Sequence, residues 1–545
     1  MNRKVFIYDT TLRDGAQGEG VSFSPAGKIA LAKRLDQFGI DYIEGGFPGS
    51  NPKDMEFFKA IQRETLSHAK IAAFGSTRRV RSKVKDDPVV QGLLAAETPV
   101  ITLYGKTWKL HVKDVLRTSL KENLAMVSDT VSYLKDCGKE VIFDAEHLFD
   151  GFKDDPDYAM QVLVAAESAG ADCLVLCDTN GGCLPHEIHE ITKTIVAAVK
   201  TPVGIHAHND IGTGVANSIE GIRAGAVQVQ GTMNGYGERC GNANLISIIP
   251  GLNLKLGVSC QGAHKLHHLR GLSLFVDDLI NVRHDTHAPY VGKSAFAHKG
   301  GAHVNAVKKN PVTFEHIEPE MVGNERHILV SELSGGSSIL LKAIEMGMGV
   351  EASSSKEDTA AILKELKSLE HKGYAYESAD ASFRILVQKV LKKHKPFFEL
   401  EGFRVIIEKR GKDAPCVSEA TVKVRVGDAI EHTVAEGEGP VNALDGALRK
   451  ALKGFYPEIA NVHLSDFRVR ILDPQEATAA TTRVQIESGD GVETWGTVGV
   501  SENIIEASWE ALVDSVEYKL FAEESKKHPV AGKKTAAGSR KKRKA

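Results

Sequence analysis

Two histidines two residues apart form the stretch with the clearest chemical meaning. His206 and His208 stand in the sequence GIHAHND, directly after the apolar residues of a predicted strand. Side chains alternate between the two faces of a strand, so both imidazoles point to the same side. Two imidazoles side by side form half of a site for a divalent metal. The alternative is a pair of ordinary surface or hydrogen-bonded histidines, since so short a pattern is common by chance.

Alternating apolar runs and amphipathic segments indicate where these histidines lie in the fold. The apolar runs predict strands at Val5–Tyr8, Tyr42–Ile43, Ile71–Phe74, Val100–Tyr104, Val141–Phe143, Cys173–Cys177, Val203–His206 and Val227–Gln230. Segments of helical period separate them, for example Pro25–Phe38, Leu120–Lys135, Tyr158–Ala169, Pro185–Val199 and Gly214–Ala224. Strict alternation of strands and helices over about 250 residues is typical of a (β/α)8 TIM barrel. A doubly wound open sheet is the alternative, but no glycine-rich nucleotide-binding turn supports it.

Polar residues follow almost every predicted strand. They stand at residues 9–17, 44–46, 104–106, 144–147, 178–182, 206–210 and 235–242. In a parallel barrel the C-terminal ends of all strands meet at one rim, where catalytic residues lie. One such cluster would be a capped turn, whereas so many at one rim indicate a functional site.

We select Asp14 and Asn242 as oxygen ligands to complete the metal site with His206 and His208. A six-coordinate cation would keep two open positions, which suits a 2-oxo acid bound through its keto and carboxylate oxygens. The metal would act as a Lewis acid on the carbonyl group. Mg²⁺ and Mn²⁺ are favoured, and Zn²⁺ is the alternative.

Three further residues at this rim each have two interpretations. Arg13 stabilises an enolate or oxyanion, or forms a salt bridge with Glu44 or Asp144. Thr179 holds a carboxylate, caps a helix, or does both. We interpret Cys240 as a small packed residue rather than a nucleophile.

Bulk composition restricts the class of protein. The chain has 545 residues, a net charge of −3, 42% hydrophobic residues and seven cysteines without CxxC spacing. We therefore expect a cytoplasmic protein with reduced thiols that binds neither nucleic acid nor membranes. The N-terminus does not resemble a signal peptide, and no apolar run reaches the roughly 20 residues of a membrane span.

The pattern changes after the barrel. We predict a catalytic barrel over residues 1–260, mostly helical linker subdomains over 261–400, a C-terminal α+β domain over 401–522 and a disordered basic tail over 523–545. The linker has helical patterns at 357–372 and 379–393. The C-terminal domain has strand patterns at Val422–Val426, Phe467–Ile471, Thr482–Ile486 and Thr494–Val500 and helices at Val441–Leu452 and Ile504–Leu520.

Three motifs carry a family resemblance: DTTLRDGAQ, HAHND and GYGERCGN. In this order and spacing they resemble the acyl-CoA synthases that perform Claisen condensations, namely the 2-isopropylmalate, homocitrate and citramalate synthases. The strings EGGFPGSNPKD, YGKTW, FDAEHLFDG and CDTNGG are most similar to the members that form citramalate. The resemblance implies a reaction of acetyl-CoA with a 2-oxo acid, here pyruvate, to give a 2-hydroxy diacid and free CoA.

The resemblance also implies roles for single residues. Asp14, His206, His208 and Asn242 match the family's metal ligands, and Arg13 matches the residue that steadies the enolate and keto oxygen. Glu146 and Thr179 match residues on the substrate side, and we place Tyr104 and Asp144 with the substrate-binding residues. His303, in the sequence GGAHVNAV, matches a histidine that the linker brings over a barrel as acid or base. Tyr290 is a weaker candidate from the same segment.

The C-terminal domain resembles the family's regulatory dimerisation domain. This implies a homodimer and an amino-acid effector, isoleucine for the members that use pyruvate; the alternative is dimerisation without a ligand. Two other classes remain as competing hypotheses, an acyl-CoA lyase on the same barrel and a non-catalytic amino-acid sensor. The large C-terminal domain argues against the lyase.

Overall fold

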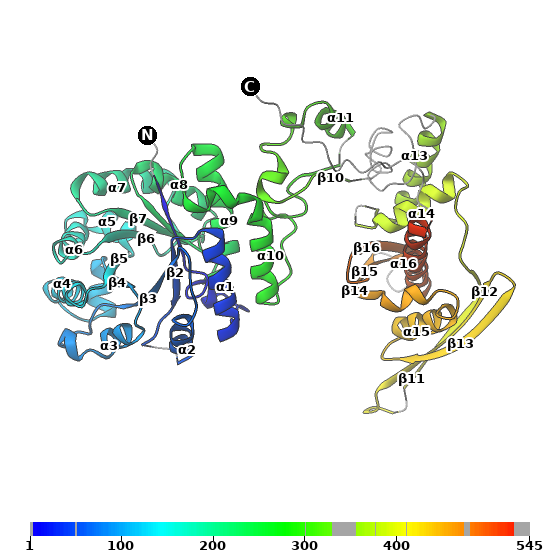
Figure 1. The fold of residues 1–545 in the computed structure, drawn as a ribbon, viewed down its shortest axis with the longest axis horizontal. Coiled ribbons are helices and arrows are strands. Elements are labelled where there is room, and N and C mark those ends of the chain that lie inside the picture. Colours follow the sequence, from blue (N-terminus) through cyan, green and yellow to red (C-terminus); the bar gives the residue numbers. More distant parts are fainter. Residues whose placement is uncertain are drawn as a thin grey trace, which may run out of the picture. The chain divides into compact units, whose positions relative to one another are not determined.

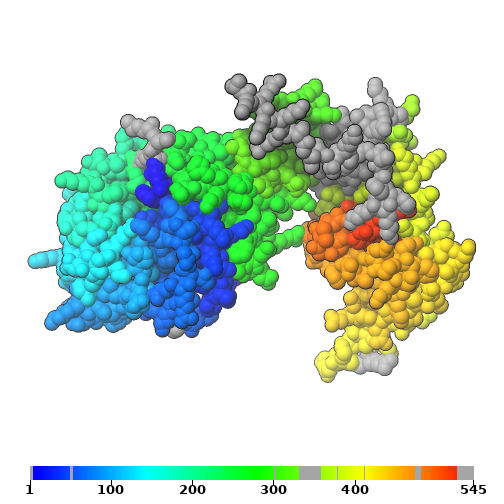
Figure 2. Space-filling model, in the orientation of Figure 1, coloured from blue at the N-terminus to red at the C-terminus, as the bar shows by residue number. Residues whose placement is uncertain are grey.

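The structure is a computed structural model that describes residues 4–49, 52–299, 301–329, 356–376, 378–409, 411–472 and 480–527. Two compact units make up the chain. The first comprises Met1–Phe296 and Ile317–Arg326, and the second comprises Ala297–His316 and His327–Ala545. Figures 1 and 2 show both units, coloured from blue at the N-terminus to red at the C-terminus. Within the described ranges, no helix is both long and apolar enough to span a bilayer.

A closed barrel of eight parallel strands forms the first unit, in the order β1 to β8 (Figure 1). This confirms the predicted (β/α)8 fold. The strands are β1 Phe6–Asp9, β2 Tyr42–Gly46, β3 Lys70–Ser76, β4 Val100–Lys106, β5 Glu140–Glu146, β6 Cys173–Asp178, β7 Val203–Ala207 and β8 Gln228–Gly231. The predicted runs find the correct strands but often stop short, because their polar last residues do not continue the apolar pattern.

Helices surround the barrel in alternation with its strands. They are α1 Pro25–Phe38, α2 Pro52–Ile61, α3 Pro88–Ala95, α4 Leu120–Asp136, α5 Leu148–Asp154, α6 Pro156–Ser168, α7 Pro185–Ala198 and α8 Gly214–Ala224. Local signals determine where α1 begins and ends. Ser24 accepts a hydrogen bond from the Gly27 amide, and Gly39 ends the helix at a φ of 103°. Ser24 is thus the N-cap of α1, and Gly39 is its glycine C-cap.

Two layers of buried side chains stabilise the barrel. The larger layer lies between the strands and the surrounding helices and includes Ile7, Ile43 and Phe143. A smaller group fills the interior of the barrel. Tyr8 belongs to it, since its hydroxyl lies 2.7 Å from Thr102 Oγ1 on β4, a strand that does not neighbour β1. The polar ends of the strands therefore rest on a packed interior rather than on a channel.

The segment after the barrel divides between the two units. Helices α9 Leu245–Pro250 and α10 Leu269–Leu279 belong to the first unit, where α10 packs against α1. The second unit contains β9 Ala297–His298, α11 Gly301–Lys309, β10 His327–Ile328, α13 Lys356–His371 and α14 Asp380–Val390. Helix α14 packs against α13 and α16. The described residues of the predicted linker therefore belong to one or other of the two units and do not form a separate domain.

Two β–β–β–α arrangements follow. The first contains β11 Glu399–Lys409, β12 Cys416–Val426, β13 Ala429–Gly437 and α15 Pro440–Leu452. The second contains β14 His463–Ile471, β15 Thr482–Gly489, β16 Thr494–Ser501 and α16 Ile504–Lys527. The α+β prediction is confirmed, although the sequence analysis missed β11 and β13. Helix α16 includes residues 523–527, so the predicted disordered tail does not begin at 523, and residues 528–545 lie outside the described ranges.

Candidate metal centre at the mouth of the barrel

The two histidines of the HAHND sequence lie side by side at the end of β7. His206 is within the strand, and His208 follows it in a bridge to Asn242. Their Nε2 atoms are 3.3 Å apart, and each residue is only 5% exposed. Period-two alternation places both rings on the inner side of the barrel, as the sequence predicts.

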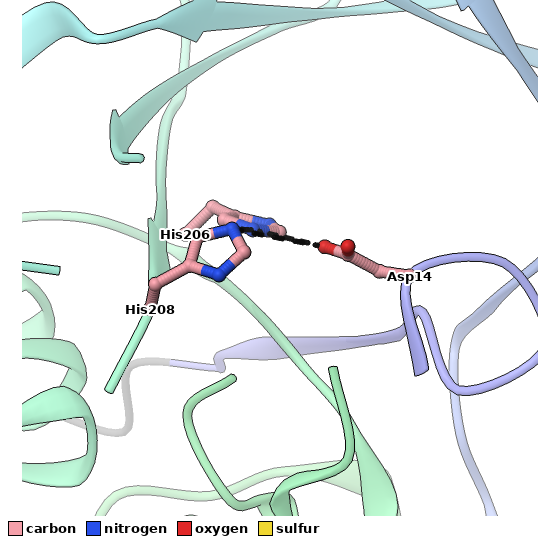
Figure 3. Close-up of side chains that lie close together, drawn as sticks. All are labelled: Asp14, His206 and His208. Atoms are coloured by element: carbon pink, nitrogen blue, oxygen red, sulfur yellow. Dashed lines mark hydrogen bonds and ion pairs between the residues drawn. The ribbon is translucent and has the colours of Figure 1, made fainter. Parts of the chain in front are cut away.

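Asp14 comes to the same place from the turn after β1. Backbone hydrogen bonds to the Thr10 carbonyl hold this turn. The Oδ2 atom of Asp14 lies 3.3 Å from His206 Nε2 and 4.0 Å from His208 Nε2, and Figure 3 shows the carboxylate facing the rings. The donor atoms of the three residues all lie within 4.8 Å of one another, close enough to share one cation.

Asn242 lies against this cluster. Its Nδ2 donates a 2.8 Å hydrogen bond to Asp14 Oδ2, while its Oδ1 is buried and has no hydrogen-bond partner in the described structure. A buried amide oxygen without a partner costs free energy, which a cation would recover. All four predicted ligands are therefore adjacent, and two imidazoles with a carboxylate and an amide oxygen suit a divalent metal.

Charge shifts the proton equilibria of the cluster. Burial raises the pKa of Asp14, but Arg13 and the two histidines outweigh it and hold that pKa below its usual range. Burial lowers the pKa of His208 to about 3, and the charge of His206 is the next largest cause. The Asp14 carboxylate is thus charged and His208 is neutral at pH 7, the forms that bind a metal.

Arg13 connects the cluster to a second network. Its Nη1 is 3.3 Å from Asp14 Oδ1, and its Nε donates a 2.5 Å hydrogen bond to Glu44 Oε1. The Tyr8 hydroxyl donates to the other Glu44 oxygen at 2.6 Å. The guanidinium group also lies over the Phe74 ring, 3.7 Å from its centroid. The salt bridge to Glu44 is therefore present, and it fixes Arg13 beside Asp14.

Asp144 and Tyr104 lie on neighbouring strands of the barrel. Asp144 accepts a 3.1 Å hydrogen bond from Gln230 Nε2, and burial raises its pKa to about 7. Tyr104 is half-buried, and its ring stacks on Phe74 with centroids 5.3 Å apart. Tyr104 contacts Phe74, which packs against Arg13. Asp144 contacts Gln230, which is hydrogen-bonded to His206.

Glu146 and Thr179 lie at the ends of β5 and β6. Glu146 Oε2 pairs with Lys106 Nζ at 2.5 Å. Thr179 Oγ1 accepts a 2.8 Å hydrogen bond from the His147 amide. The suggestion that Thr179 caps a helix is wrong, because α7 begins at Pro185 and Leu184 precedes it. Thr179 instead links two loops of the rim.

The remaining candidates lie elsewhere. His303 is on α11 in the second unit, where its ring stacks on Phe314 at 4.1 Å, so its role as acid or base stays a prediction. Tyr290 lies in the first unit, and its carbonyl accepts a hydrogen bond from Asn324. Cys240 is exposed. Its interpretation as a small packed residue is therefore wrong, because the GYGERCGN loop leaves it at the surface.

Three residues of this site, Gln230, Tyr8 and Phe74, were not predicted from the sequence. Gln230 could have been found from the strand QVQG, where polar residues occupy every second position and thus face inward. The aromatic residues gave no such signal, because aromatic side chains in strands are ordinary core residues.

A cavity of about 310 Å³ adjoins Arg13 on the side of β2 and β3. Six apolar and six polar residues line it in equal measure: Leu12, Ala16, Val21, Phe23, Phe47 and Phe74, with Arg13, Gln17, Ser22, Lys28, Lys53 and Asp54. Lys28 and Asp54 form a buried ion pair at 2.6 Å. Arg13 thus borders both this cavity and the metal cluster.

Family models match three parts of the chain. Residues 4–276 match the model described as HMGL-like, and residues 290–373 match the homocitrate synthase post-HMGL domain-like model. Residues 377–520 match the LeuA allosteric (dimerisation) domain. Among solved structures, an HMG-CoA lyase from Bacillus subtilis is 20% identical, covers 51% of this chain and 95% of its own, and has a TM-score of 0.45.

Curated relatives match the chain almost from end to end. An (R)-citramalate synthase from Geobacter sulfurreducens is 54% identical over 95% of this chain and 98% of its own. Five curated (R)-citramalate synthases have identities of 45–54%. A 2-isopropylmalate synthase from Methanocaldococcus jannaschii is 33% identical over 96% of each chain. The chain belongs to the family of the citramalate and 2-isopropylmalate synthases, as its three motifs indicated.

Proposed function

We propose that the protein condenses acetyl-CoA with pyruvate to form citramalate and free CoA. The observation that carries this proposal is the identity of 45–54% with five curated (R)-citramalate synthases over at least 94% of this chain. Identity to the 2-isopropylmalate synthase is lower, at 33%. The match of residues 377–520 to an allosteric dimerisation domain also argues against a simple lyase. Homocitrate synthase and 2-isopropylmalate synthase are the remaining alternatives.

The arrangement at the rim accounts for the chemistry. A divalent metal bound by Asp14, His206, His208 and Asn242 would supply Lewis acidity to the ketone of pyruvate. Arg13, held by Glu44, supplies a fixed positive charge beside that site for an oxyanion or enolate. The methyl group of a thioester is a weak acid, so its proton must be removed by a positioned base. We assign this role to Glu146 and the protonation steps to His303.

We propose that the cavity beside Arg13 receives the pantetheine arm of acetyl-CoA. The acetyl group must reach the ketone at the metal cluster, and Arg13 borders both spaces. The six apolar residues of its lining suit the arm, and Lys53 among its charged residues is suited to the phosphates of CoA. A volume of about 310 Å³ is far larger than the methyl group of pyruvate requires. The cavity therefore fits the second substrate better than the side chain of the first.

We further propose that the protein is a cytoplasmic homodimer inhibited by isoleucine. The outer face of the β11–β13 sheet supports dimerisation, because Ile406, Ile430 and Val434 are 37–47% exposed there. The match to an allosteric domain supports regulation by a small molecule. Free cysteines throughout the described chain agree with a reducing compartment.

Metal binding predicts a stability change. At about 100 times its Kd, Mn²⁺ should stabilise the barrel by about 2.7 kcal/mol, since it binds only the folded state. The unfolding midpoint should rise by several degrees, and EDTA should reverse the rise. His208→Ala should abolish it, whereas His189→Ala, at a histidine on α7 outside the cluster, should not. A rise that persists in His208→Ala would place the metal elsewhere. Mg²⁺ and Zn²⁺ in the same titration identify the preferred ion.

Thiol release distinguishes the substrates. The purified protein should release free CoA from acetyl-CoA with pyruvate at least 100 times faster than with 2-oxoisovalerate or 2-oxoglutarate. Differences of a few methylene groups in a closed pocket have effects of this size. Rapid release with another 2-oxo acid and none with pyruvate would refute the citramalate assignment.

A larger side chain in the cavity should raise KM for acetyl-CoA only. Val21→Phe should raise KM for acetyl-CoA about tenfold, a loss of about 1.4 kcal/mol of binding, and leave KM for pyruvate unchanged. Val199→Phe, at another half-buried valine after α7, is the matched control. If KM for pyruvate rises instead, the cavity holds the 2-oxo acid.

Dimerisation and regulation can be tested together. The intact protein should sediment as a dimer, and L-isoleucine should inhibit it. Val434→Asp places a charge on the outer face of β13 and should yield monomers that isoleucine no longer inhibits. Val492→Asp changes a valine that is 93% exposed in the turn between β15 and β16, and it should leave both properties intact. A dimeric Val434→Asp protein would contradict this choice of interface.

A further inference from the structure

Gln230 lies inside the barrel between His206 and Asp144. It is on β8, pairs in register with His206 on β7 and with Tyr8 on β1, and is fully buried. Its Oε1 lies 2.8 Å from His206 Nδ1, and its Nε2 donates to Asp144 Oδ1 at 3.1 Å. Both ends of the amide are therefore used. Because β5 does not neighbour β8, the side chain bridges the interior of the barrel.

The chemistry of these three groups determines the direction of the hydrogen bonds. A carboxylate only accepts hydrogen bonds, so ionised Asp144 requires a donor, and the structure places the Gln230 amide nitrogen against its Oδ1. The amide nitrogen of Gln230 therefore faces Asp144, which leaves the amide oxygen facing His206. An oxygen at this position requires a proton on His206 Nδ1. The lone pair of His206 is then on Nε2, which faces Asp14 Oδ2 and His208.

His208 has no comparable support. Its Nδ1 is buried without a hydrogen-bond partner in the part of the chain that the structure describes. The hydrogen bonds of the interior thus fix the tautomer of only one histidine of the pair.

We infer that Gln230 is a positioning residue that prepares His206 to bind the metal, and that Asp144 orients Gln230. The inference rests on the metal site included in the proposed function. It gives Asp144 a role inside the barrel instead of the substrate contact that the sequence analysis expected. Removing such a partner of a metal-bound histidine typically weakens metal affinity 10–100-fold.

The test measures metal affinity without any substrate. The full-length protein is titrated with Mn²⁺, and the concentration of free Mn²⁺ is measured by electron paramagnetic resonance. Gln230→Leu should raise the Kd for Mn²⁺ by roughly 10–100-fold, because an apolar side chain cannot hold the Nδ1 proton. Gln230→Glu should keep the Kd within a few-fold, since its carboxylate still accepts from Nδ1.

Gln228→Leu is the matched control. Gln228 stands two residues earlier on β8, is 3% exposed, and has an Oε1 without a hydrogen-bond partner among the described residues. Its variant should bind Mn²⁺ as the unmodified protein does. If Gln230→Leu fails to fold, Gln230→Met, with an unbranched side chain of similar length, replaces it in the same titration.

The outcomes distinguish failure of the metal site from failure of the role of Gln230. If the unmodified protein binds no Mn²⁺, the metal site itself is refuted. If it binds Mn²⁺ and the Gln230 and Gln228 variants bind equally well, only the role of Gln230 is refuted. Loss of affinity in Gln230→Glu as large as in Gln230→Leu would also overturn the inference, because the acceptor at Nδ1 would then be irrelevant.

Discussion

The site depends on keeping one carboxylate and two imidazoles together in a place from which water is nearly excluded. Asp14, His206 and His208 are each at most 5% exposed. Burying a charge is expensive unless it is paired and hydrogen-bonded. The surrounding network meets that requirement: Arg13 and Asn242 contact the carboxylate, and Gln230 contacts one imidazole. The closed barrel makes this possible, because it directs side chains from strands far apart in sequence into one interior.

The balance of charge in this interior favours a cation. Asp14, Glu44 and Asp144 all act on the single guanidinium group of Arg13. Burial also raises the pKa of Asp9 and of Asp144 to about 7, so negative charge is already costly there. A divalent ion at Asp14 would lower that cost and accept the lone pair on His206 Nε2. The same excess of carboxylates would favour the binding of a metal there.

Sequence patterns predicted local features better than contacts across the barrel. His206 and His208 are two residues apart on one strand, so alternation alone shows that they face the same side. Strand order then brought Asp14 and Asn242 to the same rim. Gln230 and Asp144 are 86 residues apart, and their contact follows only from which strands oppose each other in the closed barrel. No periodicity in either segment carries that information.

Strands without a strong apolar pattern were the main omission in the C-terminal unit. Charged residues in β11 and β13 interrupt the apolar alternation, and much of both strands is at least partly exposed. The regular structure comes from pairing with β12, whose alternate residues Ala420, Val422 and Val424 are fully buried. Tertiary pairing therefore determined these strands where local propensity was weak. The exposure of Cys240 has a similar origin, because its loop is shaped by hydrogen bonds around Asn242 and Gly235 rather than by its own apolar residues.

Arg13 unites the two halves of the proposed reaction. Its guanidinium group rests on Phe74, which stacks on Tyr104 and meets Phe47 edge to face. Phe74 and Phe47 form part of the wall of the cavity, while the polar edge of Arg13 faces Asp14. A flexible side chain would not keep one position between the cavity and Asp14. Glu44 holds Arg13 in place by a hydrogen bond from within the barrel. In the proposed reaction, the buried Tyr8–Glu44–Arg13 chain would therefore fix where an acyl group in the cavity and a ketone at the metal cluster meet.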